Sequence, residues 1–168
     1  NEIVVPNGFL LANFVIGTFS PATENTTRLR ITKASGDSIG GQVHELTMFG
    51  ASAQDIIIDG LQLSADTSGN AIPVYIDCPT TSRHAYLRNQ MISAIATYGY
   101  GCEHLLICGN SAYHDANATG DAGDWGFRIS SPGASIFFQN EVRGNSYAPL
   151  RWHPRNGSAL QYGWAAEN

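Results

Sequence analysis

A short pattern that recurs four times constrains the fold more than any other feature of the sequence. Each copy is an apolar, strand-like segment that ends in a polar residue and is followed by Gly or Asn and further apolar residues. The copies span residues 56–60, 85–89, 106–110 and 136–140. Their last residues stand at positions 60, 89, 110 and 140, so the steps are 29, 21 and 30 residues. Gly109 offers a register one residue earlier for the third copy. A period of this length predicts stacked repeat units, with turn-rich insertions over residues 65–70 and 115–124 in the longer steps.

The residue that closes each copy has a physical reason to be Gly or Asn. A sharp bend between two strands needs a residue at positive φ, which Gly adopts freely and Asn tolerates. An Asn at a stacked bend can also hydrogen-bond to the neighbouring unit through its amide. We therefore predict that Gly60, Asn89, Asn110 and Asn140 lie in line along the stack.

A second strand precedes each copy of the pattern. Apolar and polar residues alternate, as in half-buried strands, over residues 43–49, 72–77, 96–101, 125–130 and 148–153. The alternation predicts inward positions at Val74, Ile76, Phe127, Ile129, Leu150 and Trp152. Two strands joined by bends cannot bury their apolar faces alone, whereas stacking them at the ~4.8 Å strand spacing makes one core. The sequence thus predicts an all-β fold of parallel strands, and scarce hairpin signals disfavour the alternative, a β-sandwich.

In its strand rhythm and its repeated Asn turns, the chain resembles the pectate-lyase-like and phage-tailspike-like superfamily. The resemblance covers roughly residues 27–155. It implies a right-handed parallel β-helix of about five coils with turn-rich loop insertions. We expect a single domain, with an N-terminal cap segment over residues 1–26 and the β-helix over residues 27–168. The adjacent aspartate pair and the Gly-His-Gly motif typical of polygalacturonases are absent.

Charge and cysteine content exclude several classes of function. Nine Lys and Arg against 14 Asp and Glu give a net charge of -5, without the basic patch that nucleic acid requires. The early apolar stretch over residues 8–17 is too short to span a bilayer, which takes about 20 apolar residues. Cys78, Cys102 and Cys108 lack CxxC spacing, so we expect free thiols, with a Cys78–Cys102 disulfide as the alternative. We predict neither nucleic acid nor membrane as a partner.

The outward positions of the second strands form a candidate binding surface, because the resemblance implies that related enzymes hold substrate there. Its residues are Tyr75, Asp77, Tyr98, Tyr100, Arg128, Arg151 and His153. Tyr rings can stack on sugars, and Arg can form bidentate contacts with carboxylates. The alternative is a solvated strand face. Hydrolysis needs two carboxylates that flank one bond, and Asp77 alone lies on this face. For lyase chemistry the catalytic candidates are Arg128 or Arg151 as base and His153 as acid.

One polar insertion resembles the opening of a calcium loop. Its candidate ligands are Asp115, Asn117, Thr119, Asp121 and Asp124. Alternating side-chain oxygens and a Gly that permits a tight turn are what such loops need. Gly126 stands where the bidentate Glu is expected, so a metal-free insertion is the alternative. We predict no cofactor, with Ca²⁺ as the candidate if one is bound.

The sequence favours a non-catalytic surface or virion-associated module, tailspike-like or decoration-like, that binds glycans. The alternatives are a polysaccharide lyase or other carbohydrate-active enzyme, or a fragment of one, and a structural scaffold for trimer assembly. The first is favoured because the chain is short for a catalytic β-helix and its acids do not converge. Open strand edges at both ends of a stack predict a homo-oligomer or a longer chain. We expect polysaccharide as the ligand and an extracellular or virion-surface location.

Overall fold

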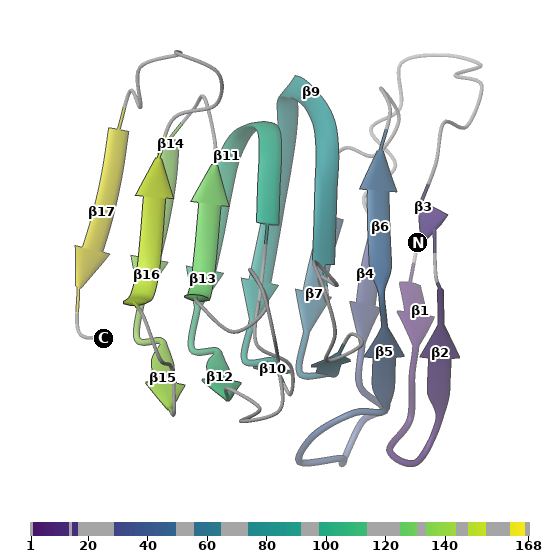
Figure 1. The fold of residues 1–168 in the computed structure, drawn as a ribbon. Helices are drawn as coiled ribbons and strands as arrows, with labels where there is room; N and C mark the ends of the chain where they lie inside the picture. Colours follow the sequence, from purple (N-terminus) through teal and green to yellow (C-terminus); the bar gives the residue numbers. More distant parts are fainter. Residues whose placement is uncertain are drawn as a thin grey trace, which may run out of the picture.

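The computed structural model consists of parallel β-strands. It describes residues 2–13, 15–16, 29–49, 56–64, 74–91, 98–113, 125–130, 134–143, 148–153 and 162–166. Within these ranges every regular element is a strand, and the strands pair in parallel to form an 11-stranded and a 6-stranded sheet. The described part of the chain is therefore all-β, which agrees with the prediction from the repeat (Figure 1).

The strand pairings define three rows that the chain visits in turn. The first row contains β1 (Glu2–Val4), β4 (Leu29–Thr32), β7 (Ile56–Asp59), the second halves of β9 (Val74–Leu87) and β11 (Tyr98–Cys108), β14 (Ala134–Phe138) and β17 (Tyr162–Ala166). The second row contains β2 (Leu10–Ala12), β5 (Gln42–His44), β8 (Gln62–Ser64), β10 (Gln90–Met91), β12 (Ser111–Tyr113) and β15 (Glu141–Arg143).

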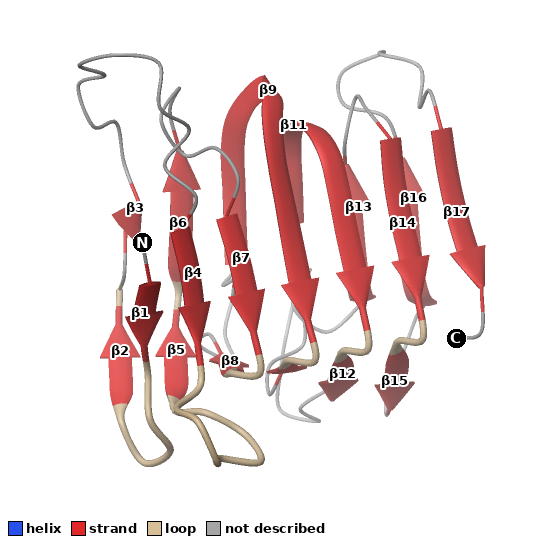
Figure 2. Ribbon diagram, turned by 180° about the vertical axis from the view of Figure 1, so that it is seen from behind, coloured by secondary structure: helices blue, strands red, loops and turns tan. Residues whose placement is uncertain are grey.

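The third row contains β3 (Val15–Ile16), β6 (Leu46–Phe49), the first halves of β9 and β11, β13 (Trp125–Ser130) and β16 (Ala148–His153). β9 and β11 are long strands that bend over from the third row into the first (Figures 1 and 2). They therefore join these two rows into the 11-stranded sheet, while the second row is the 6-stranded sheet.

The core lies between the rows and is built from stacked apolar columns. In the first row, Ile31 pairs with Ile58, and Ile107 pairs with Phe137. In the second row, Val43 pairs with Leu63. All of these side chains are buried. Full burial of such a side chain contributes about 1.5 to 3 kcal/mol, and here it requires the turns above and below.

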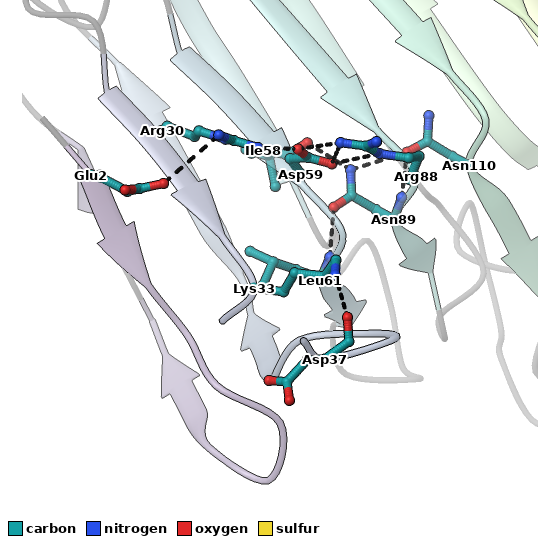
Figure 3. A network of polar contacts seen from close by, with 10 residues as sticks. All are labelled: Glu2, Arg30, Lys33, Asp37, Ile58, Asp59, Leu61, Arg88, Asn89 and Asn110. Carbon is teal, nitrogen blue, oxygen red and sulfur yellow. Dashed lines mark hydrogen bonds and ion pairs between the residues drawn. The ribbon is translucent and has the colours of Figure 1, made fainter. Parts of the chain in front are cut away.

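Three asparagines stack at the bends between the first and second rows, as predicted. Asn89, Asn110 and Asn140 are buried. The Asn89 backbone N–H donates to Asn110 Oδ1 at 2.9 Å, and the Asn110 N–H donates to Asn140 Oδ1 at 3.0 Å. The side-chain Nδ2 of Asn89 and of Asn110 donates to the same oxygens at 3.0 and 2.9 Å. We call these three residues the Asn ladder, of which Figure 3 shows Asn89 and Asn110.

The prediction that Gly60 belongs to this line is wrong by one residue. Leu61 takes that position, and its N–H donates to Asn89 Oδ1 at 3.0 Å. The bends are made by the residue before each ladder position, and these residues have positive φ: Gly60 at 71°, Arg88 at 53°, Gly109 at 66° and Gln139 at 50°. The bend residue and the ladder residue have different roles for a simple reason. The bend residue takes the left-handed backbone, and the next residue directs its side chain into the interior, where the amide finds partners.

The sequence also predicted two strands in each repeat, whereas the structure has three strands in each repeat. The missed strands are those of the second row, which are two or three residues long. Within the predicted cap segment, β1, β2 and β3 pair in parallel with β4, β5 and β6. The predicted domain boundary at residues 26–27 lies outside the described residues.

Candidate functional site

The backbone register brings four of the predicted binding residues into one line across the third row. Tyr75 pairs with Tyr98, Tyr98 with Arg128, and Arg128 with Arg151. Thr47 of β6 precedes Tyr75 in the same line. We call Tyr75, Tyr98, Arg128 and Arg151 the Tyr–Arg row.

The other three predicted residues lie two positions further along their strands. Asp77 pairs with Tyr100, and His153 pairs with Ser130. Residues two apart in a strand share a face of the sheet, so the register groups all seven on one face. Leu46, the residue before Thr47 on β6, is buried and pairs with Val74. The outward orientation of the seven side chains stays a prediction.

The catalytic candidates are part of this arrangement. Arg128 and Arg151 are direct neighbours across two strands, and His153 follows Arg151 by two residues on β16. The structure describes the backbone at these positions, while the side chains of the seven residues lie outside what it describes. Their roles in binding or catalysis stay predictions.

The predicted calcium ligands Asp115, Asn117, Thr119, Asp121 and Asp124 lie outside the described residues, so that site also stays a prediction. Among the residues that the structure does describe, His, Cys, Asp and Glu form no group of three or more that could hold a metal ion. In the same ranges the chain has no apolar helix of membrane-spanning length. Cys108 is a half-buried free thiol.

A charged cluster lies at the first-row bends, and it was not predicted from the sequence. Asp59, at the end of β7, has a side chain only 3% exposed. Arg88 reaches it with Nη2 at 2.7 Å from Oδ1 and 2.6 Å from Oδ2, and with Nε at 2.9 Å from Oδ1. Arg30 of β4 donates through Nη2 to Oδ2 at 2.6 Å. The two guanidinium groups approach the carboxylate from opposite sides (Figure 3).

The electrostatics of Asp59 balance burial against these two cations. Burial alone raises the pKa of the carboxyl group, but the hydrogen bonds and charges of Arg88 and Arg30 lower it, and the net pKa lies below its ordinary value. The hydrogen bond to Asp59 correspondingly raises the pKa of Arg88. Asp59 is therefore ionised at neutral pH, because a buried carboxylate with two guanidinium partners is better satisfied than a buried carboxylic acid.

A groove with a volume of about 540 Å³ opens beside this cluster. We call it the charged groove. Its charged lining residues are Glu2, Arg30, Lys33, Asp59 and Arg88. Arg30 Nη1 lies 3.9 Å from Glu2 Oε1, and Lys33 Nζ donates to the backbone oxygen of Asp37. The volume falls within the range of ligand pockets, roughly 300 to 1,000 Å³.

The repeat contains a signal that points to this cluster. Asp59 and Arg88 are the polar residues that end successive copies of the pattern, with opposite charges. A register at the bend places Asp59 beside Leu87, one residue before Arg88. The aligned copies therefore already indicate the contact between Asp59 and Arg88, although the true register is shifted by one residue.

Comparison with known proteins adds no family to this picture: no protein-family model matches the chain, nor does any curated protein or solved structure.

Proposed function

We propose that the chain is a right-handed parallel β-helix of the pectate-lyase-like and tailspike-like superfamily. The parallel pairings, the cyclic order of the three rows and the Asn ladder support this fold. Of the six second-row strands, five (β5, β8, β10, β12 and β15) lie within residues 27–168. That number agrees with about five predicted coils, and β2 adds a turn within residues 1–26.

We further propose that the protein is a non-catalytic surface or virion-associated module that binds acidic polysaccharide. The observation that carries this proposal is the register of the Tyr–Arg row, in which two Tyr and two Arg residues, both sugar-compatible types, follow one another on neighbouring strands. Neighbouring parallel strands are ~4.8 Å apart, so the row offers regularly spaced contacts to a ligand that is itself a linear repeat. Tyr75 and Tyr98 stack on sugar rings, and Arg128 and Arg151 bind carboxylates in bidentate pairs.

The distribution of acids supports binding over hydrolysis. Retaining and inverting glycosidases need two carboxylates at a separation of roughly 5 to 10 Å. On the predicted face Asp77 is the single acid among the seven residues, so this set contains no carboxylate pair for hydrolysis. Homo-oligomer formation through the strand edges and bound Ca²⁺ at the Asp115 loop belong to the same proposal. The scaffold for trimer assembly is the alternative without a ligand.

A polysaccharide lyase is the second candidate, favoured by the register of Arg128 with Arg151 and by His153 two residues further on. Lyase chemistry needs a base and a cation that neutralises the uronate carboxylate. In this reading one Arg abstracts the proton, the other binds the carboxylate and His153 protonates the leaving oxygen. Elimination leaves an unsaturated uronate that absorbs in the ultraviolet.

The binding proposal is tested by calorimetric titration with oligogalacturonate, oligoalginate and a neutral oligosaccharide of equal length. We expect Arg128→Ala and Arg151→Ala each to weaken binding of an acidic oligomer by about tenfold or more, which is about 1.4 kcal/mol. Arg143→Ala, an exposed Arg of β15 paired with Glu141, is the matched control and should bind like the wild type. Equal affinity in all variants contradicts the role of the row.

Incubation of the protein with the same acidic oligomers, followed by ultraviolet absorbance, separates binding from catalysis. A rise in ultraviolet absorbance that Arg151→Ala or His153→Ala abolishes would establish the lyase and replace the binding module as the function. If the protein is a binding module, it binds the acidic oligomer without a rise in ultraviolet absorbance.

A further inference from the structure

We infer that the charged groove is a separate binding site for a small sugar acid, a monoanionic carboxylate that carries several hydroxyl groups. The groove lies at the bends of the first row, whereas the Tyr–Arg row belongs to the third row. The inference therefore does not depend on the proposed function, although both ligands carry carboxylates.

Two guanidinium groups in the groove keep donors for a ligand. Arg88 uses Nε and Nη2 on Asp59, and within the described part of the chain its Nη1 has no hydrogen-bond partner. Arg30 likewise donates to Asp59 through Nη2. Its Nη1 lies 3.9 Å from Glu2 Oε1, which is beyond hydrogen-bond distance. The side chain of Arg88 is 67% exposed and that of Arg30 is 47% exposed. A carboxylate in the groove can therefore reach donors of both residues.

Asp59 and Gly60 prepare the groove for such a ligand. Asp59 is buried and holds both guanidinium groups from below, so little side-chain freedom remains to be lost on binding. Gly60 has no Cβ, and a Cβ at this position would come within 2.7 Å of Lys33 Cδ. The aliphatic part of the Lys33 side chain therefore passes close over the bend at Gly60, and Lys33 is one of the residues that line the groove.

The charges in the groove select the class of ligand. Arg30, Lys33 and Arg88 carry three positive charges, and Glu2 and Asp59 carry two negative charges, so the local excess is a single positive charge in a protein of net charge -5. A monoanion neutralises this excess, whereas a phosphate dianion or a doubly charged sulfate leaves an unbalanced negative charge beside Glu2.

The remaining lining residues match the hydroxyl groups of a sugar acid. Ser35 and Ser38 are exposed on the groove, and each hydroxyl both donates and accepts hydrogen bonds. The carboxylate of Glu2 is half-exposed and accepts hydrogen bonds from the hydroxyl groups of the ligand. Val4, 48% exposed, offers an apolar contact for the C–H groups of a sugar ring.

The test is a titration of the intact chain with sodium glucuronate, with sodium sulfate and glucose as comparison ligands at constant ionic strength. Binding is followed by calorimetry and by the NMR signals of the Arg Nε–H groups. We expect glucuronate to bind and to shift the Arg88 signal. Arg88→Gln should weaken the affinity about fivefold or more, because a charge-assisted pair is lost. Arg143→Gln, at an exposed Arg outside the groove, should bind like the wild type.

Each other outcome overturns the inference or locates binding elsewhere. Unchanged affinity in Arg88→Gln and Arg30→Gln, with loss in Arg128→Ala, assigns the ligand to the Tyr–Arg row and refutes the groove. Sulfate that binds as tightly as glucuronate refutes a site for sugar acids. Absence of binding by the wild type leaves the cluster as a structural ion pair. The side chain of Arg88 is 67% exposed, and Arg30→Gln is the second variant that tests the groove if Arg88→Gln fails to fold.

Discussion

Buried side-chain amides hold the bends between the first and second rows together. Asn89 Nδ2 donates to the Ile58 carbonyl at 2.9 Å, and Asn89 Oδ1 accepts from the Leu61 N–H. Asn140 repeats the first contact on the Ile107 carbonyl at 2.9 Å. Such backbone groups would otherwise be buried without partners, which costs about 1 to 3 kcal/mol each. The side chains of Asn89 and Asn140 thus each satisfy a backbone carbonyl of the neighbouring turn.

We expect Asn89→Ala to lower the free energy of unfolding by about 1 to 3 kcal/mol, measured by chemical denaturation. Asn89→Leu is the informative companion, because the equivalent position one turn earlier is Leu61, which is fully buried. Leu fills the space that Ala leaves empty but supplies no acceptor for the Leu61 N–H. If Asn89→Leu is as stable as the wild type, the ladder contributes volume and not hydrogen bonds. Gln90→Ala, exposed on β10, is the control.

The charge on Asp59 makes stability depend on pH at the acidic end. Its folded pKa lies below the ordinary value, so its contribution is present above the unfolded pKa of about 3.9 and is lost as pH falls through the folded pKa. We expect Asp59→Asn to destabilise at pH 7 by about 1.5 kcal/mol, the low end for charged hydrogen bonds because both Arg partners are solvated. The gap to the wild type should narrow as pH falls below the unfolded pKa of about 3.9.

Denaturation series at pH 7, 5 and 3 check this. A gap that stays constant over the series would mean that the charge of Asp59 is not what stabilises the bend. Glu141→Gln is the matched control, because Glu141 pairs with Arg143 at 2.7 Å in an exposed ion pair. We expect that substitution to leave both stability and its pH dependence nearly unchanged.

At the scale of the elements, four first-row bends use positive φ with different residue types. Gly60 and Gly109 have φ values of 71° and 66°, whereas Arg88 and Gln139 adopt 53° and 50° with side chains present. The left-handed conformation costs an L-residue roughly 1 kcal/mol or more. The bend at Gly60 carries a second constraint, the close approach of Lys33.

We therefore expect Gly60→Ala to destabilise more than Gly109→Ala. Both place an Ala at positive φ, at a cost of about 1 to 2 kcal/mol. A Cβ at Gly109 meets Arg88 Cγ at an ordinary 3.5 Å, whereas a Cβ at Gly60 meets Lys33 Cδ at 2.7 Å. The difference between their midpoints in urea isolates the contact with Lys33. Equal losses would show that Lys33 moves aside without cost.

The longer strands could be predicted from the sequence because alternation needs several residues to be recognised. Residues 125–130 and 148–153 coincide with β13 and β16, and residues 43–49 include β6 and all of β5 except Gln42. The second-row strands escape this reasoning because two or three residues carry no measurable period. Their presence depends on pairing with the turns above and below.

The two candidate sites differ in how much of each could be predicted from the sequence. The sequence grouped the residues of the Tyr–Arg row as outward positions of the second strands, whereas the register of Tyr98 with Arg128 comes from the structure. The charged groove also depends on Arg30, which no copy of the pattern contains. The copies 56–60 and 85–89 align Asp59 with Arg88, whereas Arg30 reaches Asp59 from the neighbouring strand β4 through Nη2.

At the scale of the whole molecule, a turn at the end of the stack leaves more of its apolar side chains exposed than a turn with neighbours on both sides. Stability in such an arrangement is approximately a sum over units and their interfaces. Within the described residues, β1 and β2 stand at the ends of their rows and pair on one side only, with β4 and β5. Exposed apolar side chains gather there, with Val4 at 48%, Phe9 at 65% and Leu10 at 62%.

An edge with unpaired backbone groups and exposed apolar side chains is a template for association. We expect the double variant Phe9→Lys, Leu10→Lys to reduce concentration-dependent self-association in sedimentation velocity, because charges on an edge strand oppose pairing with another chain. Ile136→Lys is the matched control. Ile136 is 45% exposed, but its strand β14 is paired on both sides, with β11 and β17. If Ile136→Lys abolishes association and the double variant does not, copies associate through the outer face of the first row and not through the β2 edge.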